Sequence, residues 1–117
     1  MAKNYIQPGN TITWTNEDVT GAVDVASGDG VVAGSLFGVA QTDIAIGDDG
    51  ELALIGVWEL PKVSAQAWTF GQRIYWVAAS GEATTTAGSN KLIGVAVEAA
   101  DNPSATGKVR LSAAFTI

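Results

Sequence analysis

The sequence predicts a small all-β fold, a β-barrel or sandwich contained in one domain spanning residues 1–117. Apolar and polar residues alternate along most of the chain, which is the period of a β-strand. Fourteen glycines against three prolines indicate many tight turns between the apolar runs. The chain has 117 residues, 47% of them hydrophobic and 15% charged, which suits one domain with its own core.

The clearest alternation lies at the C-terminus, where Val109, Leu111, Ala113, Phe115 and Ile117 share one face. Residues 51–60 are apolar on both faces, which is typical of a central strand or of a face between subunits. Further strands are expected at 10–15, 22–26, 31–33, 36–41, 73–77, 82–86 and 92–98. Residues 63–68, after a proline, are the one segment in which we expect a short helical turn.

An imperfect internal repeat runs through the chain. The sequence Leu-Phe-Gly-Val-Ala at 36–40 matches Leu-Ile-Gly-Val-Ala at 92–96. Each copy is followed by a polar stretch, then by a glycine, and then by an alternating strand. The glycine is Gly50 after the first copy and Gly107 after the second. The second copy has an extra hairpin at about 78–88. We therefore expect two similar β-units that close one barrel, preceded by an extended N-terminal arm at residues 1–9.

Composition excludes most chemistry. The chain has no cysteine and no histidine, which removes disulfides, His- or Cys-ligated zinc and nucleophiles activated by histidine. Its net charge is −6 and its six basic residues are scattered, so we expect no nucleic-acid binding. No apolar run approaches the roughly 20 residues of a membrane span, and no signal peptide is visible. We predict a soluble protein made in a cytoplasm, without catalytic residues, cofactor or metal.

Two motifs contain residue types that are used in chemistry, but their spacing favours a simpler interpretation. Residues 47–51 bring three carboxylates together, but they lack the spacing of a calcium loop and suit a hairpin turn. A small carboxylate-dependent hydrolase remains a remote alternative. Gly107-Lys108 is followed by Val109 and enters a strand, so it is not a phosphate loop.

The aromatic residues allow three interpretations. The four tryptophans, Trp14, Trp58, Trp68 and Trp76, suit core packing or subunit contacts better than a platform for stacking sugars. Tyr75 and Trp76 are adjacent, so their side chains point to opposite faces and at least one faces away from a single core. With the two-sided 51–60 segment, this predicts a subunit interface that includes Ile55, Val57, Tyr75 and Trp76.

Several segments, in this order, carry a family resemblance: MAKNY at 1–5, GSLFGVA at 34–40, GVWELPK at 56–62, YW at 75–76, LIGVAVEAA at 92–100 and GKVRL at 107–111. The chain resembles an uncharacterised-domain family encoded among the head genes of tailed phages, whose members look like capsid decoration, or cement, proteins. The middle section, 14–24, departs from the family's pattern. The family is often labelled a predicted RecA/RadA-type recombinase, which this sequence contradicts because it has no phosphate loop and no basic DNA face.

The resemblance implies a structural virion protein on the outside of the expanded phage capsid, where it stabilises joints between major capsid subunits. The expected partners are the phage major capsid protein and further copies of the chain, as a homotrimer, with no nucleic acid and no membrane. A carbohydrate-binding β module displayed on a virion or host surface is the alternative.

The N-terminal arm is the expected capsid-binding segment. Pro8 restricts the preceding residue to an extended conformation, and an extended arm can add as an edge strand to a partner's sheet. Its candidate binding residues are Ala2, Lys3, Asn4, Tyr5, Ile6 and Gln7.

Overall fold

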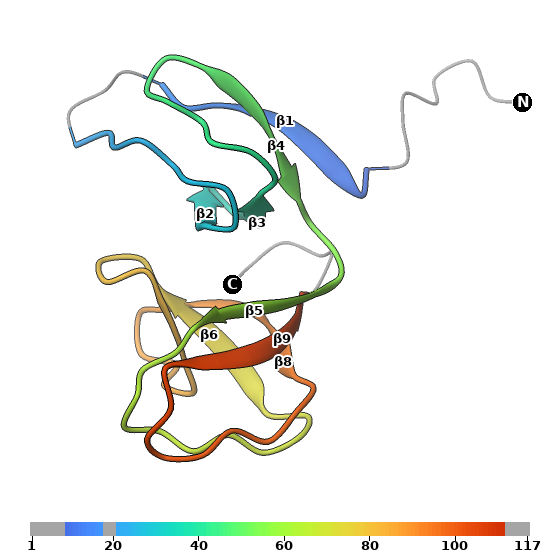
Figure 1. Cartoon of the computed structure of the whole chain (residues 1–117), viewed down its shortest axis with the longest axis vertical. Coiled ribbons are helices and arrows are strands. Elements are labelled where there is room, and N and C mark those ends of the chain that lie inside the picture. Colours follow the sequence, from blue (N-terminus) through green and yellow to red (C-terminus); the bar gives the residue numbers. More distant parts are fainter. Residues whose placement is uncertain (1–8, 18–20, 112–117) are drawn as a thin grey trace, which may run out of the picture.

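The computed structural model describes residues 9–17 and 21–111. Its antiparallel strands form two curled sheets. The first sheet has the order β1-β4-β3-β2 and the second β5-β9-β8-β6-β7. The strands are β1 (Thr11–Thr15), β2 (Gly30–Ala33), β3 (Leu36–Ala40), β4 (Asp49–Ala53), β5 (Val57–Pro61), β6 (Arg73–Val77), β7 (Glu82–Thr84), β8 (Lys91–Ala96) and β9 (Thr106–Leu111). Figure 1 shows the two sheets one above the other, together forming a half-barrel, with the β4–β5 link joining them.

The all-β prediction is confirmed, because the described residues contain no helix. Residues 63–68 form a tight turn and not the helical turn that we expected. Strand β9 shows the predicted alternation, with Val109 and Leu111 buried and Lys108 and Arg110 exposed. The other three residues of that predicted face, Ala113, Phe115 and Ile117, lie outside the described residues.

The prediction of one strand over 51–60 is wrong. Strand β4 ends at Ala53 and β5 begins at Val57, in a different sheet. Gly56, with φ of 107°, makes the bend in a conformation that side chains disfavour. The Trp58 indole N–H donates to the Ile55 carbonyl at 3.0 Å and holds the bend. Because apolar alternation continues through it, the pattern did not reveal the break.

The strand predicted at 22–26 is also absent. Only Val25 pairs there, through two hydrogen bonds with Ile44 of 3.0 and 2.7 Å. The adjacent Val23 is 68% exposed. Among the described residues, the predicted strand is thus reduced to an isolated bridge.

The internal repeat is confirmed by matching backbone contacts. In the first unit Gly28 donates to Ala40 at 2.7 Å, and in the second Gly71 donates to Ala96 at 2.7 Å. The bridge at Val25 likewise has its counterpart between Trp68 and Ala100. Strand β7, within the predicted extra hairpin, pairs with β6 at the edge of the second sheet.

Gly50 and Gly107, which the repeat also places at equivalent positions, allow close approach of a large side chain. A Cβ on Gly50 would collide with Ile44, and a Cβ on Gly107 would collide with the Trp68 ring. Each unit therefore needs glycine at this point to pack its main core side chain against the backbone.

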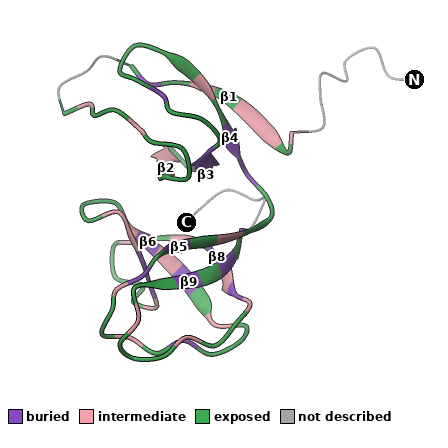
Figure 2. Ribbon diagram, in the orientation of Figure 1, coloured by how far each residue is buried: buried purple, intermediate pink, exposed green. Residues whose placement is uncertain are grey.

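Two hydrophobic clusters hold the structure. The smaller lies on the first sheet and includes Val31, Ala40, Ile44, Leu52 and Leu54. The larger lies on the second sheet and includes Leu60, Trp68, Ile74, Trp76, Ile93, Val109 and Leu111. Figure 2 shows buried segments in both sheets.

Strand β3 links the sheets, because its Phe37 and Val39 belong to the larger cluster. The rings of Phe37 and Trp76 have centroids 5.1 Å apart at an interplanar angle of 55°, a favourable tilted aromatic contact. The two units therefore share part of their core.

Candidate functional site

The turn predicted at 47–51 is present only at the start of that segment, because residues 49–51 belong to strand β4. Asp48 donates its backbone N–H to the Ala45 carbonyl at 3.0 Å, and Gly47 has φ of 89°. The next two carboxylates lie on the exposed side of β4, where Asp49 accepts from the Thr15 hydroxyl and Glu51 accepts from the Thr13 hydroxyl. In the part of the chain that the structure describes, no three acidic, histidine or cysteine side chains are grouped so that they could hold a metal.

The tryptophans do not form a sugar-binding platform. Trp68 and Trp76 are 1% and 5% exposed, so neither offers a ring face to a ligand. Trp14 and Trp58 are half-buried and lie on different sheets, packed against different clusters. Core packing, one of the two favoured interpretations, therefore describes Trp68 and Trp76.

The outer side of the second sheet carries both arginines of the chain. Registered pairing places Val57 opposite Arg110, Arg110 opposite Val95, and Val95 opposite Arg73. Apolar and cationic side chains thus alternate across four neighbouring strands. Within the described residues, neither guanidinium takes part in an ion pair or hydrogen bond.

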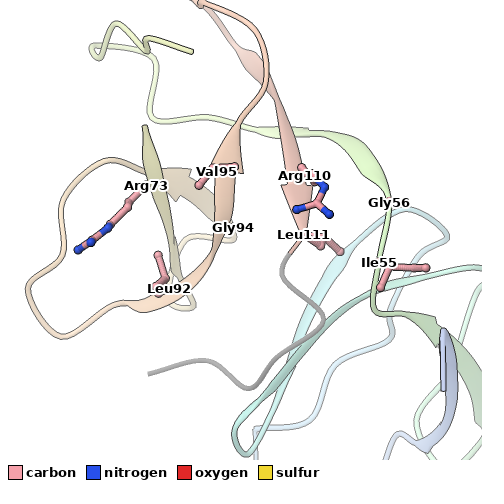
Figure 3. Close-up of a pocket in the computed structure, with 8 residues that line it drawn as sticks. All are labelled: Ile55, Gly56, Arg73, Leu92, Gly94, Val95, Arg110 and Leu111. Atoms are coloured by element: carbon pink, nitrogen blue, oxygen red, sulfur yellow. The ribbon is translucent and has the colours of Figure 1, made fainter. Parts of the chain in front are cut away.

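A hollow of about 550 Å³ lies on the same side of the sheet. Figure 3 shows its lining residues, with Arg73 and Leu92 on one side of the view and Ile55 on the other. We call the surface made by Ile55, Val57, Arg73, Leu92, Val95 and Arg110 the arginine face. A surface of this kind, apolar with charged groups at intervals, suits a macromolecular contact better than a reaction.

Three of the four residues predicted for a subunit interface lie at or beside the arginine face. Ile55 and Val57 are 38% and 55% exposed, and half-buried Tyr75 is paired with Leu92. Trp76 points to the opposite side, as its adjacency to Tyr75 requires, and it packs inside the same chain. It therefore has almost no surface to offer a partner.

The predicted capsid-binding residues, Ala2 to Gln7, lie outside the described residues. Sequence reasoning did not single out Arg73 and Arg110. Their placement on the same side of one sheet depends on the pairing of β6, β8 and β9. The repeat offered a partial signal, because it placed β8 and β9 in one unit.

Sequence reasoning also missed two buried polar side chains, Asn16 and Lys62, 5% and 1% exposed. Each directly follows the first strand of its unit. Asn16 donates to the carbonyls of Val23 and Ile44, whereas Lys62 donates to three loop carbonyls. Both side chains therefore stabilise the loops whose carbonyls they contact.

Comparison with known protein families gives one match, to the family described as phage cement protein, over residues 6–111. That description does not carry the recombinase label. Comparison with curated proteins and with solved structures finds no match. Among the described residues there is no helix long and apolar enough to cross a membrane.

Proposed function

The chain belongs to the phage cement protein family, and we propose that it binds the outer surface of the expanded capsid and stabilises joints between major capsid subunits. Family membership over residues 6–111 carries this proposal. It gives the chain a structural role in the virion. The finer statement, on where and how it binds, is our inference.

The architecture suits such a role. A cement protein needs a stable scaffold with broad, shallow contacts, and a typical contact needs about 800 Å² per partner. Two sheets that share core residues through Phe37 and Val39 provide one scaffold, which we propose acts as a single domain over residues 1–117. A net charge of −6 keeps densely coated particles apart in solution. Synthesis in the bacterial host cytoplasm follows from this proposal.

The test mixes purified protein with expanded capsids that lack it, followed by imaging and by heating of the particles. We expect ordered extra density outside the shell and a higher disruption temperature. Unexpanded capsids are the control, and we expect them to bind much less. Absence of added density on expanded capsids would contradict the proposal.

We further propose that the N-terminal arm, residues 1–9, contributes to capsid binding through Ala2–Gln7. Backbone pairing with an edge strand of the shell needs no particular side chain. Deletion of residues 2–7 should leave the thermal midpoint nearly unchanged and lower capsid occupancy. If the deletion unfolds the domain, the arm is an internal part of the fold, and if occupancy is unchanged, the arm is not a binding element.

Self-association, as a homotrimer, is the remaining part of the proposal. It is supported by the exposed apolar side chains of Ile55 and Val57 and by half-buried Tyr75, which pairs with Leu92 of the arginine face. Three linked copies would multiply weak capsid contacts through effective concentration. Light scattering over a concentration series tests it, and we expect the mass of three chains at high concentration.

A further inference from the structure

We propose that copies of this chain associate head to tail, with the arginine face of one copy against a carboxylate strip on the first sheet of the next. The strip consists of Thr13, Thr15, Asp49 and Glu51. This inference rests on the proposed self-association and names the two surfaces that would meet.

Arg73 and Arg110 are exposed and flank Val95 in register. Neighbouring strands are about 4.8 Å apart, so the two Cα atoms lie on the order of 10 Å from each other. The chain is acidic, with a net charge of −6. Even so, both of its arginines lie on one side of one sheet, and neither has a partner among the described residues. Guanidinium groups suit planar recognition of carboxylates.

The carboxylate strip is the matching surface on the first sheet. Asp49 and Glu51 are two residues apart on β4, so both point to the same side, and both are exposed. Cross-strand pairing sets Thr15 opposite Asp49 and Thr13 opposite Glu51. Each threonine hydroxyl donates to its carboxylate, which orients the carboxylate and leaves its other oxygen available for an arginine.

Apolar burial adds to these ion pairs. Val57, 55% exposed, and Ile55, 38% exposed, lie beside Arg110 and would lose contact with water when the face is covered. Exposed ion pairs alone contribute little, so the apolar groups provide affinity while the charges determine orientation.

The occupant is a second copy because the complementary charge belongs to this same chain. The two surfaces differ, one basic and one acidic, so the contact is heterologous and closes into a ring or continues as a chain. A two-fold dimer through the arginine face alone would place four guanidinium groups together, which the repulsion of like charges disfavours.

Charge reversal tests the pairing. Sedimentation and light scattering should show that Arg73→Glu and Arg110→Glu each weaken association about tenfold or more, and that Asp49→Arg with Glu51→Arg does the same. Lys91→Glu, the same charge change at an exposed lysine outside both surfaces, is the matched control and should change little. Raising salt from about 0.05 to 0.5 M should weaken wild-type association.

The decisive variant carries all four reversals, R73E, R110E, D49R and E51R. Its surfaces are again complementary, so the association constant should return to near the wild-type value. Such a recovery would also show that the single reversals did not act by misfolding. If the fourfold variant stays weak, or the arginine reversals have no effect on a wild type that does associate, the head-to-tail pairing is wrong while self-association stands. A wild type that stays monomeric to about 1 mM overturns both. If arginine reversal lowers capsid occupancy and spares self-association, the arginine face binds the shell, and the pairing proposed here is wrong.

Discussion

Replacing Lys62 tests how the second unit holds its loops together. The side chain is 1% exposed, and its Nζ donates to the carbonyls of Val63, Ser64 and Ser104 at 3.0, 3.3 and 3.3 Å. The ammonium also lies 6.0 Å from the centroid of the Trp68 ring. No carboxylate pairs with it among the described residues, so these carbonyls and the ring are what stabilise a buried charge.

Two substitutions separate the contribution of the Lys62 ammonium to stability from that of its aliphatic stem. Lys62→Met keeps most of the volume and removes three bonds from a charged donor, each about 1.5–3 kcal/mol. The variant also avoids the cost of burying the ammonium, which is several kcal/mol. This gain offsets much of the lost hydrogen bonding, so we expect the free energy of unfolding to fall by about 2 kcal/mol. Lys62→Ala also removes the stem from the core, and we expect a loss of about 4 kcal/mol in total.

Urea unfolding monitored by tryptophan fluorescence measures these losses. At about 4 °C per kcal/mol for a domain of this size, the thermal midpoint should fall by about 8 °C for the methionine variant. Lys91→Met removes an exposed lysine and should change stability by less than about 0.5 kcal/mol. If Lys62→Met is as stable as wild type, the three carbonyl contacts only compensate for burial of the charge, and the reasoning fails.

Four further substitutions test the packing of the two units. Asn16→Ala removes two bonds to carbonyls in the first unit and should cost about 1–3 kcal/mol in urea unfolding; no change would mean that water replaces both. Gly107→Ala drives a Cβ into the Trp68 ring and should destabilise by about 1–3 kcal/mol, and a neutral result in calorimetry would show that the ring can move aside. Trp58 is half-buried, so Trp58→Ala should lower the free energy of unfolding by about 1–2 kcal/mol. Trp68 is fully buried, and Trp68→Ala should lower it by about 3–5 kcal/mol. Equal losses for the two variants would contradict this ranking.

Alternation and turn signals predicted most of the strands, edge strands included. This holds for β9, whose inward and outward residues follow the pattern, and for the repeat around β3 and β8. It did not show where one sheet ends and the next begins, because Leu54 and Ile55 keep the alternation in phase through the bend at Gly56.

The candidate surfaces were harder to predict than the strands. Ile55 and Val57 were found because they are apolar residues on the outward side of their segment. The arginines were not, since Arg73 and Arg110 are 37 positions apart in the chain and lie on the same side of one sheet only through the register of β6, β8 and β9. The equivalence of Asn16 and Lys62 was also hidden, because two chemically different side chains perform the same task.

The order of pairing has a consequence for synthesis on the ribosome. The first sheet contains strands only up to Ala53, whereas β5 must wait for β9, which ends at Leu111. At about 5–20 residues per second, several seconds separate the two events. During that time Phe37 and Val39 of the nascent first sheet lack the residues that cover them in the finished protein. The first sheet thus emerges with a ready apolar surface, on which the second sheet folds when its last strand has been made.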